Sequence, residues 1–220
     1  MTQASLRVTR DRHWISPYFF SVFVTLKEKG LAFDIEGVNL HEGAQRQPGY
    51  ATSTITARVP ALFHRTSDGE FVLGESSAIV EYLEDVFPAP GHRAVLPSNV
   101  RDRARARQIM AWIRSDDTLA IREHRSTTTM FYERSTSPLP EAAKSAADKL
   151  LAVAGRLVTT SAPLFGEFTI ADADLAFMLM RLVMNGDPVP DTLARYARHV
   201  WERPTVKEFV DIDRPAFIPY

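Results

Sequence analysis

The chain has 220 residues, a formal net charge of -1, 45% hydrophobic residues and 24% charged residues. This length allows one large domain or two small domains with cores of their own, since domains commonly hold about 100 to 150 residues. The composition excludes wholesale disorder and a membrane-embedded chain, and the charge argues against a protein that coats nucleic acid. The absence of cysteine excludes disulfides, cysteine zinc sites and attack by a protein thiol.

Two apolar stretches could be mistaken for targeting or membrane segments. Residues 18–26 follow several arginines, but Pro17 precedes them, charged residues 27–29 follow, and no small-x-small cleavage site appears. Residues 170–184 contain acidic side chains and are shorter than the roughly 18 residues that a membrane span needs. We interpret both stretches as buried helices and expect a cytoplasmic protein.

The first part of the chain predicts alternating strands and helices. Ser16-Pro17 places a capping residue before a proline at the first helical position, and Ser67-Asp68-Gly69 is typical of a hairpin turn. The expected elements are a strand at 6–10, a helix from Pro17 to about Gly30, a strand at 33–40, a polar irregular segment at 41–57, hairpin strands at 61–64 and 71–73, and a helix at 76–87. This order predicts a thioredoxin-like α/β domain.

A segment rich in proline and glycine, from Pro88 onward, separates this domain from a second one. The later periodicity predicts only helices, at 101–123, 139–160, 170–185, 191–200 and 205–211. We therefore expect an α/β N-terminal domain over 1–87, a linker over 88–100, and an all-α C-terminal helical domain over 101–220.

Four motifs along the chain resemble one family. They are Ser16-Pro17-Tyr18, Val59-Pro60-Ala61-Leu62, Glu75-Ser76-Ser77-Ala78-Ile79 and Thr169-Ile170-Ala171-Asp172. In identity and spacing they resemble the glutathione transferase superfamily over nearly the whole chain. Residues 103–112 and 175–182 look closest to the bacterial YfcF-type transferases, which are serine-type; Arg58, before the Val-Pro pair, departs from many relatives. The resemblance implies the glutathione transferase fold, a homodimer, glutathione as co-substrate and no further cofactor.

By this resemblance Ser16 is the catalytic residue, a stabiliser of the glutathione thiolate rather than the attacking group. A free thiol has a pKa of about 8.5, so only a few per cent is thiolate at neutral pH. A hydrogen bond from the Ser16 hydroxyl and the positive end of the helix would supply the roughly 2.7 kcal/mol that a two-unit pKa depression needs. From the local pattern alone, an ordinary helix cap is the favoured interpretation of Ser16. Tyr18 is a rival hydroxyl donor, although it is expected to pack.

The resemblance also assigns residues that would bind glutathione. Val59 and the cis proline Pro60 would pair with the cysteinyl unit, and Glu75 with Ser76 would bind the γ-glutamyl group. Gln47 is favoured over Gln45 and Arg46 for the glycyl carboxylate. Each motif also has a purely structural interpretation, as a loop entry before a strand, a capped helix or a polar loop.

Other motifs favour structure over chemistry. Thr169 to Asp172 is a variant of the capping box. The arginine run at 101–107 is expected to be a solvated or dimer-facing helix surface, because its members alternate between two faces. The six histidines show no spacing typical of metal ligands, so no metal site is expected.

Two alternatives to a transferase are compatible with parts of the sequence. Gly74-Glu75-Ser76-Ser77-Ala78 resembles a hydrolase nucleophile elbow, but the final glycine is absent and no strands follow to carry an acid and a histidine. A non-catalytic glutathione transferase-like binding module is the stronger alternative. For an enzyme, we expect a small apolar electrophile as second substrate, and hydroperoxide reduction is as compatible with these residues as conjugation.

Overall fold

The computed structural model describes residues 5–219, and contacts divide them into two units: 5–94 with 211–219, and 95–210. The elements of the first unit are β1 (Leu6–Asp11), α1 (Pro17–Glu28), β2 (Phe33–Val38), the 3-10 turn η1 (Ala44–Arg46), α2 (Pro48–Thr54), β3 (Ala61–Thr66), β4 (Gly69–Gly74) and α3 (Ser76–Val86). The segment between α3 and residue 100 contains no helix or strand.

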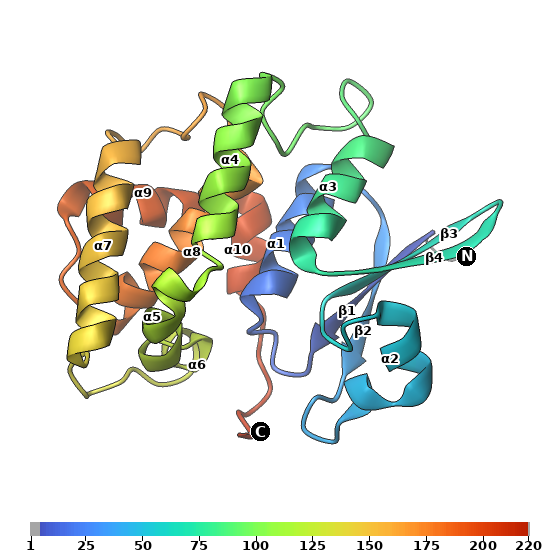
Figure 1. Ribbon diagram of the computed structural model, residues 1–220, viewed down its shortest axis with the longest axis horizontal. Coiled ribbons are helices and arrows are strands. Elements are labelled where there is room, and N and C mark those ends of the chain that lie inside the picture. Colours follow the sequence, from blue (N-terminus) through green and yellow to red (C-terminus); the bar gives the residue numbers. More distant parts are fainter. Residues whose placement is uncertain (1–4, 220) are drawn as a thin grey trace. The chain divides into compact units, whose positions relative to one another are not determined.

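The four strands form one mixed sheet in the order β2-β1-β3-β4. β1 pairs in parallel with β2 and antiparallel with β3, which forms the expected hairpin with β4. Figure 1 shows α1 and α3 on one face of this sheet and α2 on the other. The predicted strands and helices of the thioredoxin-like layout are therefore present, with α2 as an addition.

Helix α1 forms the centre of this unit, because nearly all of its residues after the first turn are buried. Ser16 caps the helix and Pro17 occupies its first position, as the sequence indicates. Its C-terminal end is tied to α3 by a buried ion pair of 2.6 Å between Lys29 Nζ and a carboxylate oxygen of Glu84. Lys29 also donates to the carbonyl of Phe87 at 2.9 Å, so the ammonium group is solvated by protein oxygens.

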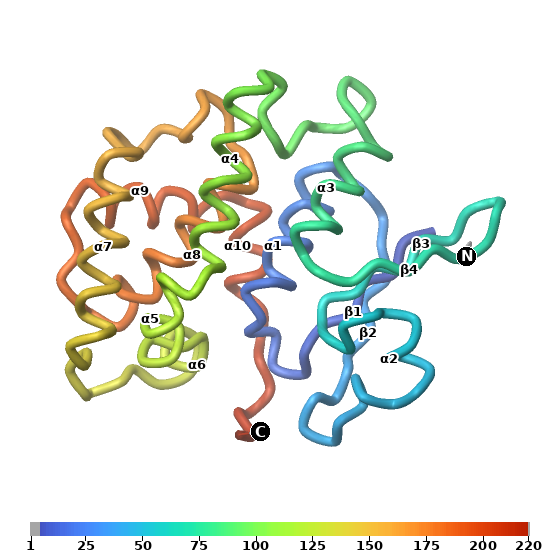
Figure 2. The backbone as a smooth tube through the Cα atoms, viewed as in Figure 1, coloured from blue at the N-terminus to red at the C-terminus, as the bar shows by residue number. Residues whose placement is uncertain are grey.

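The second unit is helical throughout. Its elements are α4 (Val100–Trp112), η2 (Asp116–Thr118), α5 (Leu119–His124), α6 (Thr127–Phe131), α7 (Glu141–Leu157), α8 (Ile170–Asn185), α9 (Asp191–Trp201) and α10 (Pro204–Val210). Helix α8 runs through the middle of the unit and contacts α4, α6 and α9 (Figure 2). Every residue from Ile170 to Leu182 is buried, so apolar side chains occupy every face of this segment beside the buried Asp172, Asp174 and Arg181.

The structure corrects three predictions of secondary structure. The helix expected over 101–123 is interrupted after Trp112, where the Thr118 hydroxyl lies near the carbonyls of Ile113 at 2.8 Å and Ser115 at 3.3 Å and can donate to them. Such short polar side chains compete with the helical hydrogen bonds of the backbone. Helix α2 lies in the segment expected to be irregular, and the short helix α6 was not expected; both contain several threonine residues, which carry little helical signal.

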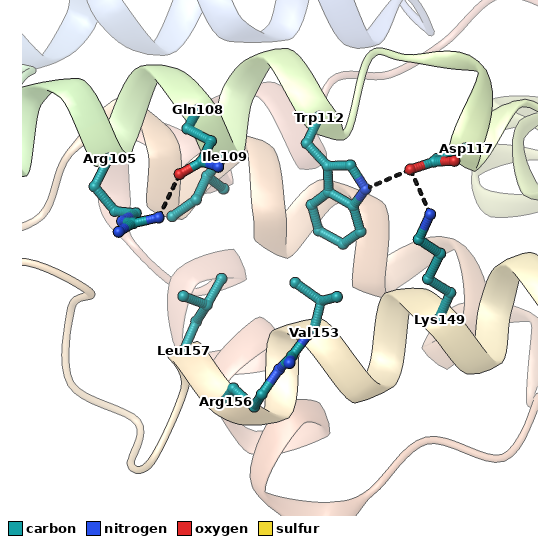
Figure 3. A pocket seen from close by; sticks show the side chains of 9 residues that line it. All are labelled: Arg105, Gln108, Ile109, Trp112, Asp117, Lys149, Val153, Arg156 and Leu157. Atoms are coloured by element: carbon teal, nitrogen blue, oxygen red, sulfur yellow. Dashed lines mark hydrogen bonds and ion pairs between the residues drawn. The ribbon is translucent and has the colours of Figure 1, made fainter.

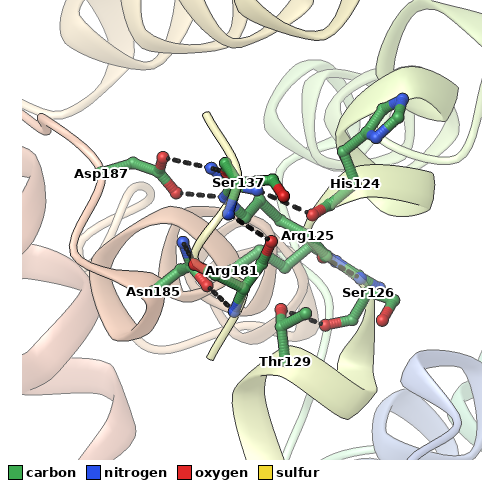
Figure 4. Close-up of polar contacts among 9 residues, drawn as sticks. His124, Arg125, Ser126, Thr129, Ser137, Arg181, Asn185 and Asp187 are labelled. Carbon is green, nitrogen blue, oxygen red and sulfur yellow. Dashed lines mark hydrogen bonds and ion pairs between the residues drawn. The ribbon is translucent and has the colours of Figure 1, made fainter. Parts of the chain in front are cut away.

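A buried arginine joins the shorter helices of the second unit to α8. Arg125 binds both carboxylate oxygens of Asp187, at 2.6 and 2.8 Å, and its carbonyl accepts a hydrogen bond from Arg181 at 2.9 Å (Figure 4). The terminal nitrogen that binds Asp187, Nη2, also donates to the carbonyl of Ser137 at 3.1 Å, and Nη1 donates to the carbonyl of His124 at 2.9 Å. This planar, bidentate arrangement suits arginine and fixes the loop that follows α5.

The capping box predicted at the start of α8 is present, and it extends further than the sequence indicates. The buried carboxylate of Asp172 accepts the N–H and the hydroxyl of Thr169, both at 2.8 Å. Its other oxygen accepts the Leu164 N–H at 2.7 Å and the Tyr196 hydroxyl at 2.9 Å. Asp172 therefore joins a loop, the helix start and α9 as well as capping α8.

Replacing Asp172 should cost more stability than removing an ordinary cap. In Asp172→Ala four donors lose their acceptor, so the free energy of unfolding should fall by about 3 kcal/mol. Thr169→Ala should cost only about 1 kcal/mol. Urea unfolding followed by circular dichroism measures both, and equal losses would contradict the role given to Asp172.

Candidate functional site

The register of the sheet brings three of the four motifs to one end of the first unit. Leu62 of β3 pairs with Val8 of β1, so the start of β3 lies beside the end of β1, from which the chain enters α1. Ala61 of β3 pairs with Gly74 of β4, so the residues just before Ala61 and just after Gly74 also meet there. Ser16, Val59-Pro60 and Glu75-Ser76 therefore surround the same end of the sheet.

The loop that carries Ser16 is held by a buried carboxylate that sequence reasoning missed. One oxygen of Asp11 accepts the N–H groups of His13 at 3.0 Å and Ile15 at 3.2 Å, and the other accepts the Ser16 N–H at 3.0 Å. The Ser16 hydroxyl oxygen accepts the Phe19 N–H at 3.2 Å. A single acidic residue at the end of a strand gives little signal in the sequence, because its partners are all backbone groups.

The turn before β3 contains a cis peptide bond between Val59 and Pro60. Helix α2 holds this turn from one side, because the Tyr50 hydroxyl donates to the carbonyl of Arg58 at 2.9 Å. The same hydroxyl lies 2.8 Å from Thr9 Oγ1 of β1, which accepts the Ala61 N–H at 2.9 Å. Helix α2 thus positions the backbone of the Val-Pro motif.

Glu75 and Ser76 form the turn from β4 into α3. Glu75 has a φ of 63° and an exposed side chain, whereas Ser76 is buried as the first residue of the helix. Gly74, just before them, lies so close to α2 that an added Cβ would stand 2.8 Å from the Thr54 carbonyl oxygen. The turn therefore presents the free N–H groups of a helix start next to a carboxylate.

The three candidates for the glycyl carboxylate lie between β2 and α2. Gln47 is the residue before α2, and its side chain is exposed and makes no capping hydrogen bond. Gln45 and Arg46 lie in the preceding 3-10 turn. The register of the sheet does not bring Gln47 next to the three motifs, so its role stays a prediction.

The end of the chain returns to the loop before Ser16, a contact that no sequence pattern indicates (Figure 2). The Ile218 N–H donates to Nε2 of the buried His13 at 3.2 Å, and the ring of Phe217 lies 5.1 Å from the His13 ring. Arg214 Nε donates to the Trp14 carbonyl at 3.2 Å. Nε2 must be unprotonated to accept this bond, and burial lowers the pKa of His13, with Asp11 opposing that shift.

The second unit has a hollow of its own, with a volume of about 450 Å³, between α4 and α7 (Figure 3). Its apolar walls include Ile109 and Val153, and Trp112 Nε1 donates to Asp117 at 3.2 Å. Lys149 Nζ binds the same carboxylate oxygen at 2.7 Å. None of the site residues predicted from the sequence lines this hollow.

The fold and the clustered motifs define a class of protein: a thioredoxin-like unit with a helix-start site, followed by a helical unit. Sequence comparison matches residues 15–86 to the N-terminal domain and residues 99–214 to the C-terminal domain of glutathione S-transferases. The chain belongs to the glutathione S-transferase family, which confirms the predicted fold class. In the described residues, no helix is long and apolar enough to cross a membrane.

Three relatives illustrate the similarity. Glutathione S-transferase 3 of maize (Zea mays) is 30% identical over 92% of this chain and 88% of its own length. Glutathione S-transferase theta-3 of mouse (Mus musculus) is 35% identical over 92 residues, 42% of this chain and only 36% of that protein. A glutathione transferase homologue from Burkholderia, solved with bound glutathione, is 41% identical, covers 93% of this chain and 96% of its own, and has a TM-score of 0.75.

Asp11→Asn should destabilise the first unit. An amide offers one acceptor oxygen where the carboxylate offers two, so its NH₂ group must face a backbone N–H, at a cost of about 2 kcal/mol. The control is Asp34→Asn on the exposed side of β2, which should change stability by less than about 0.5 kcal/mol. Urea unfolding compares the two variants, and similar midpoints would contradict the role of Asp11.

The His13 contact should make stability depend on pH. Because the folded pKa lies below the ordinary 6.5, the unfolded state binds more protons between these two values. The contribution is therefore complete above about pH 6.5 and is lost as the pH falls toward the lowered folded pKa. The wild-type unfolding free energy should fall more steeply from pH 7 to pH 5 than that of His13→Gln, by at most about 1.4 kcal/mol per pH unit. Parallel pH profiles would refute this.

Proposed function

We propose that this protein is a serine-type glutathione transferase in which Ser16 stabilises the thiolate of bound glutathione for attack on a small electrophile. The observation that carries the proposal is the hydrogen bonding of Ser16. Its oxygen accepts the Phe19 N–H of the first helical turn, and a hydroxyl keeps its own proton for one further acceptor. The cap role and the role toward sulfur are therefore compatible in one side chain.

The electrostatics of this position favour an anion. Ser16 stands at the N-terminus of α1, a helix of twelve residues without an acidic side chain in its first turn. The helix end contributes about 0.3 to 2 kcal/mol and a hydrogen bond to a charged acceptor about 1.5 to 3 kcal/mol. Together these suffice to lower a thiol pKa from about 8.5 to near neutrality.

The other residues of the site would hold the tripeptide in place. In this proposal the Val59 backbone pairs with the cysteinyl unit beside Pro60, as an added strand would. The helix start at Ser76 binds the γ-glutamyl carboxylate, and the Glu75 carboxylate binds the ammonium group. Gln47 is assigned the glycyl carboxylate. Each of these functions uses backbone or side-chain groups at the turns described above.

Several properties accompany this proposal. We assign the protein to a serine-type group that resembles the bacterial YfcF-type transferases in sequence, and we expect a cytoplasmic homodimer without a further cofactor. The relatives support glutathione as the thiol substrate, since the Burkholderia homologue was solved with it bound. Hydroperoxide reduction is a second reaction open to the same thiolate, in which two glutathione molecules are oxidised to the disulfide and the peroxide becomes an alcohol and water.

Ser16→Ala tests the central assignment. The variant should bind glutathione with a dissociation constant within about threefold of wild type, because the tripeptide's other contacts remain. Its conjugation rate with 1-chloro-2,4-dinitrobenzene should fall by about ten- to a hundredfold through the loss of one charge-assisted hydrogen bond. Calorimetry gives the affinity, and the thiolate absorbance near 240 nm, followed against pH, gives the pKa of the bound thiol.

Tyr18→Phe is the matched control, since it removes the rival hydroxyl of the same helical turn. A loss of rate in Tyr18→Phe with full activity in Ser16→Ala would reverse the assignment. Wild-type protein that binds glutathione but conjugates no electrophile and reduces no hydroperoxide would instead be a non-catalytic binding module.

A further inference from the structure

A second hollow of the first unit lies beside the loop that carries Ser16. Its volume is about 330 Å³, which suits a small molecule. The lining residues come from the end of β1 and the following loop, the end of β2, and the returning tail: Arg10, Arg12, Trp14, Gly37, Val38, Asn39 and Pro215. None of them is acidic, so two guanidinium groups dominate the charge of the hollow.

Among residues 5–219, neither arginine forms an ion pair with a carboxylate. Arg10 Nη1 donates to the carbonyls of Asp11 at 2.8 Å and Arg12 at 3.1 Å, and its Nε is buried without a hydrogen-bond partner among residues 5–219. Arg12 has an exposed side chain, and within the same residues it forms no ion pair. The Asp11 carboxylate acts on the Arg10 charge without an ion pair, and its oxygens accept three backbone N–H groups.

The environment of Arg10 makes this unpaired charge costly. Its guanidinium lies 3.9 Å from the centre of the Trp14 ring, and burial lowers its pKa from the ordinary value, with the Asp11 carboxylate opposing that shift. A partly desolvated cation without a counterion gains free energy when an anion arrives. An incoming carboxylate would be bound more strongly here than by an arginine in open solvent.

The loop between β1 and α1 lines the hollow and also carries Ser16, the residue assigned to the thiolate. Trp14 lines the hollow, and the edge of its ring meets Phe19 of α1 at 5.6 Å between ring centres. Phe19 in turn donates its N–H to the Ser16 hydroxyl. The hollow therefore borders the loop that carries Ser16, the residue assigned to the sulfur.

The geometry points to an acidic second substrate: a compact electrophile whose carboxylate binds Arg10 and Arg12 while its reactive carbon faces the thiolate. This inference rests on the proposed transferase function and deepens it. It also differs from the apolar electrophile expected from the sequence, because the arginines occur in ordinary polar positions of a strand and loop and only the folded chain places them together.

The reaction of a test substrate balances without a further reactant. The glutathione thiolate attacks the chlorine-bearing carbon of 4-chloro-3,5-dinitrobenzoate and forms a C–S bond. The C–Cl bond breaks, and chloride leaves with the bonding electron pair. The proton of the thiol passes to solvent. The methyl ester of the same acid undergoes the same substitution but offers no negative charge to the arginines.

The experiment compares the acid with its methyl ester. For each compound, kcat/KM is divided by the rate constant of its uncatalysed reaction with glutathione. The ratio of this quotient for the acid to that for the ester is then compared between proteins. Wild type should favour the acid by about tenfold, as expected for two cations that are partly exposed. Arg12→Gln should lower the ratio by about threefold. Arg65→Gln, an exposed arginine of β3 outside the hollow, should leave the ratio unchanged.

A binding measurement separates this inference from the proposed function. Calorimetry with 3,5-dinitrobenzoate, which has no leaving group, tests the hollow without turnover. Binding that weakens in Arg12→Gln and not in Arg65→Gln supports the acidic site even if no electrophile is conjugated, in which case the transferase proposal fails alone. The inference is wrong if acid and ester are conjugated with equal efficiency and all three proteins bind 3,5-dinitrobenzoate equally. The transferase proposal would still stand in that case.

Discussion

The candidate site depends on one buried carboxylate. Asp11 accepts three backbone N–H groups of the loop between β1 and α1, and these hydrogen bonds fix the loop. Without an acceptor, the N–H groups of His13, Ile15 and Ser16 would face a buried interior at the end of a strand, where unpaired donors are costly. Bound to one carboxylate, they fix the path of the chain into α1. The position of the Ser16 hydroxyl follows from that path.

Contacts to the backbone also hold the other two turns of the site. Helix α2 reaches the Val-Pro turn through Tyr50 and packs so closely on the end of β4 that only glycine fits at position 74. The site therefore consists of three turns at one end of a sheet, each held by a neighbour in space. Such a site presents mainly backbone N–H and C=O groups, and the proposed binding of glutathione uses these groups.

The sequence predicts a helix best where its first residues include a capping side chain, because the capping hydrogen bonds join residues that are close in the chain. Ser16-Pro17 marked the start of α1, and Thr169 with Asp172 marked the start of α8, because capping residues act within one helical turn. Features that depend on distant partners were missed. Helix α2 is stabilised by contacts with the sheet, the role of Asp11 lies in backbone donors, and the return of the tail to His13 joins residues more than two hundred positions apart. The roles of Ser16, Val59, Glu75 and Ser76 toward glutathione come from resemblance and stay predictions.

The hydrogen bonds of Asp11 also affect the electrostatics of the loop. Asp11 stands between Arg10 and Arg12 in the chain, and among residues 5–219 its carboxylate acts on Arg10 without forming an ion pair with either arginine. Its two oxygens are instead occupied by the backbone, so their orientation is set by the loop and not by the arginines. Arg10 is held in turn by main-chain carbonyls of the same loop. A chain of nearly zero net charge thereby keeps a local excess of positive charge beside the residue assigned to the sulfur, and an anion is the ligand that relieves it.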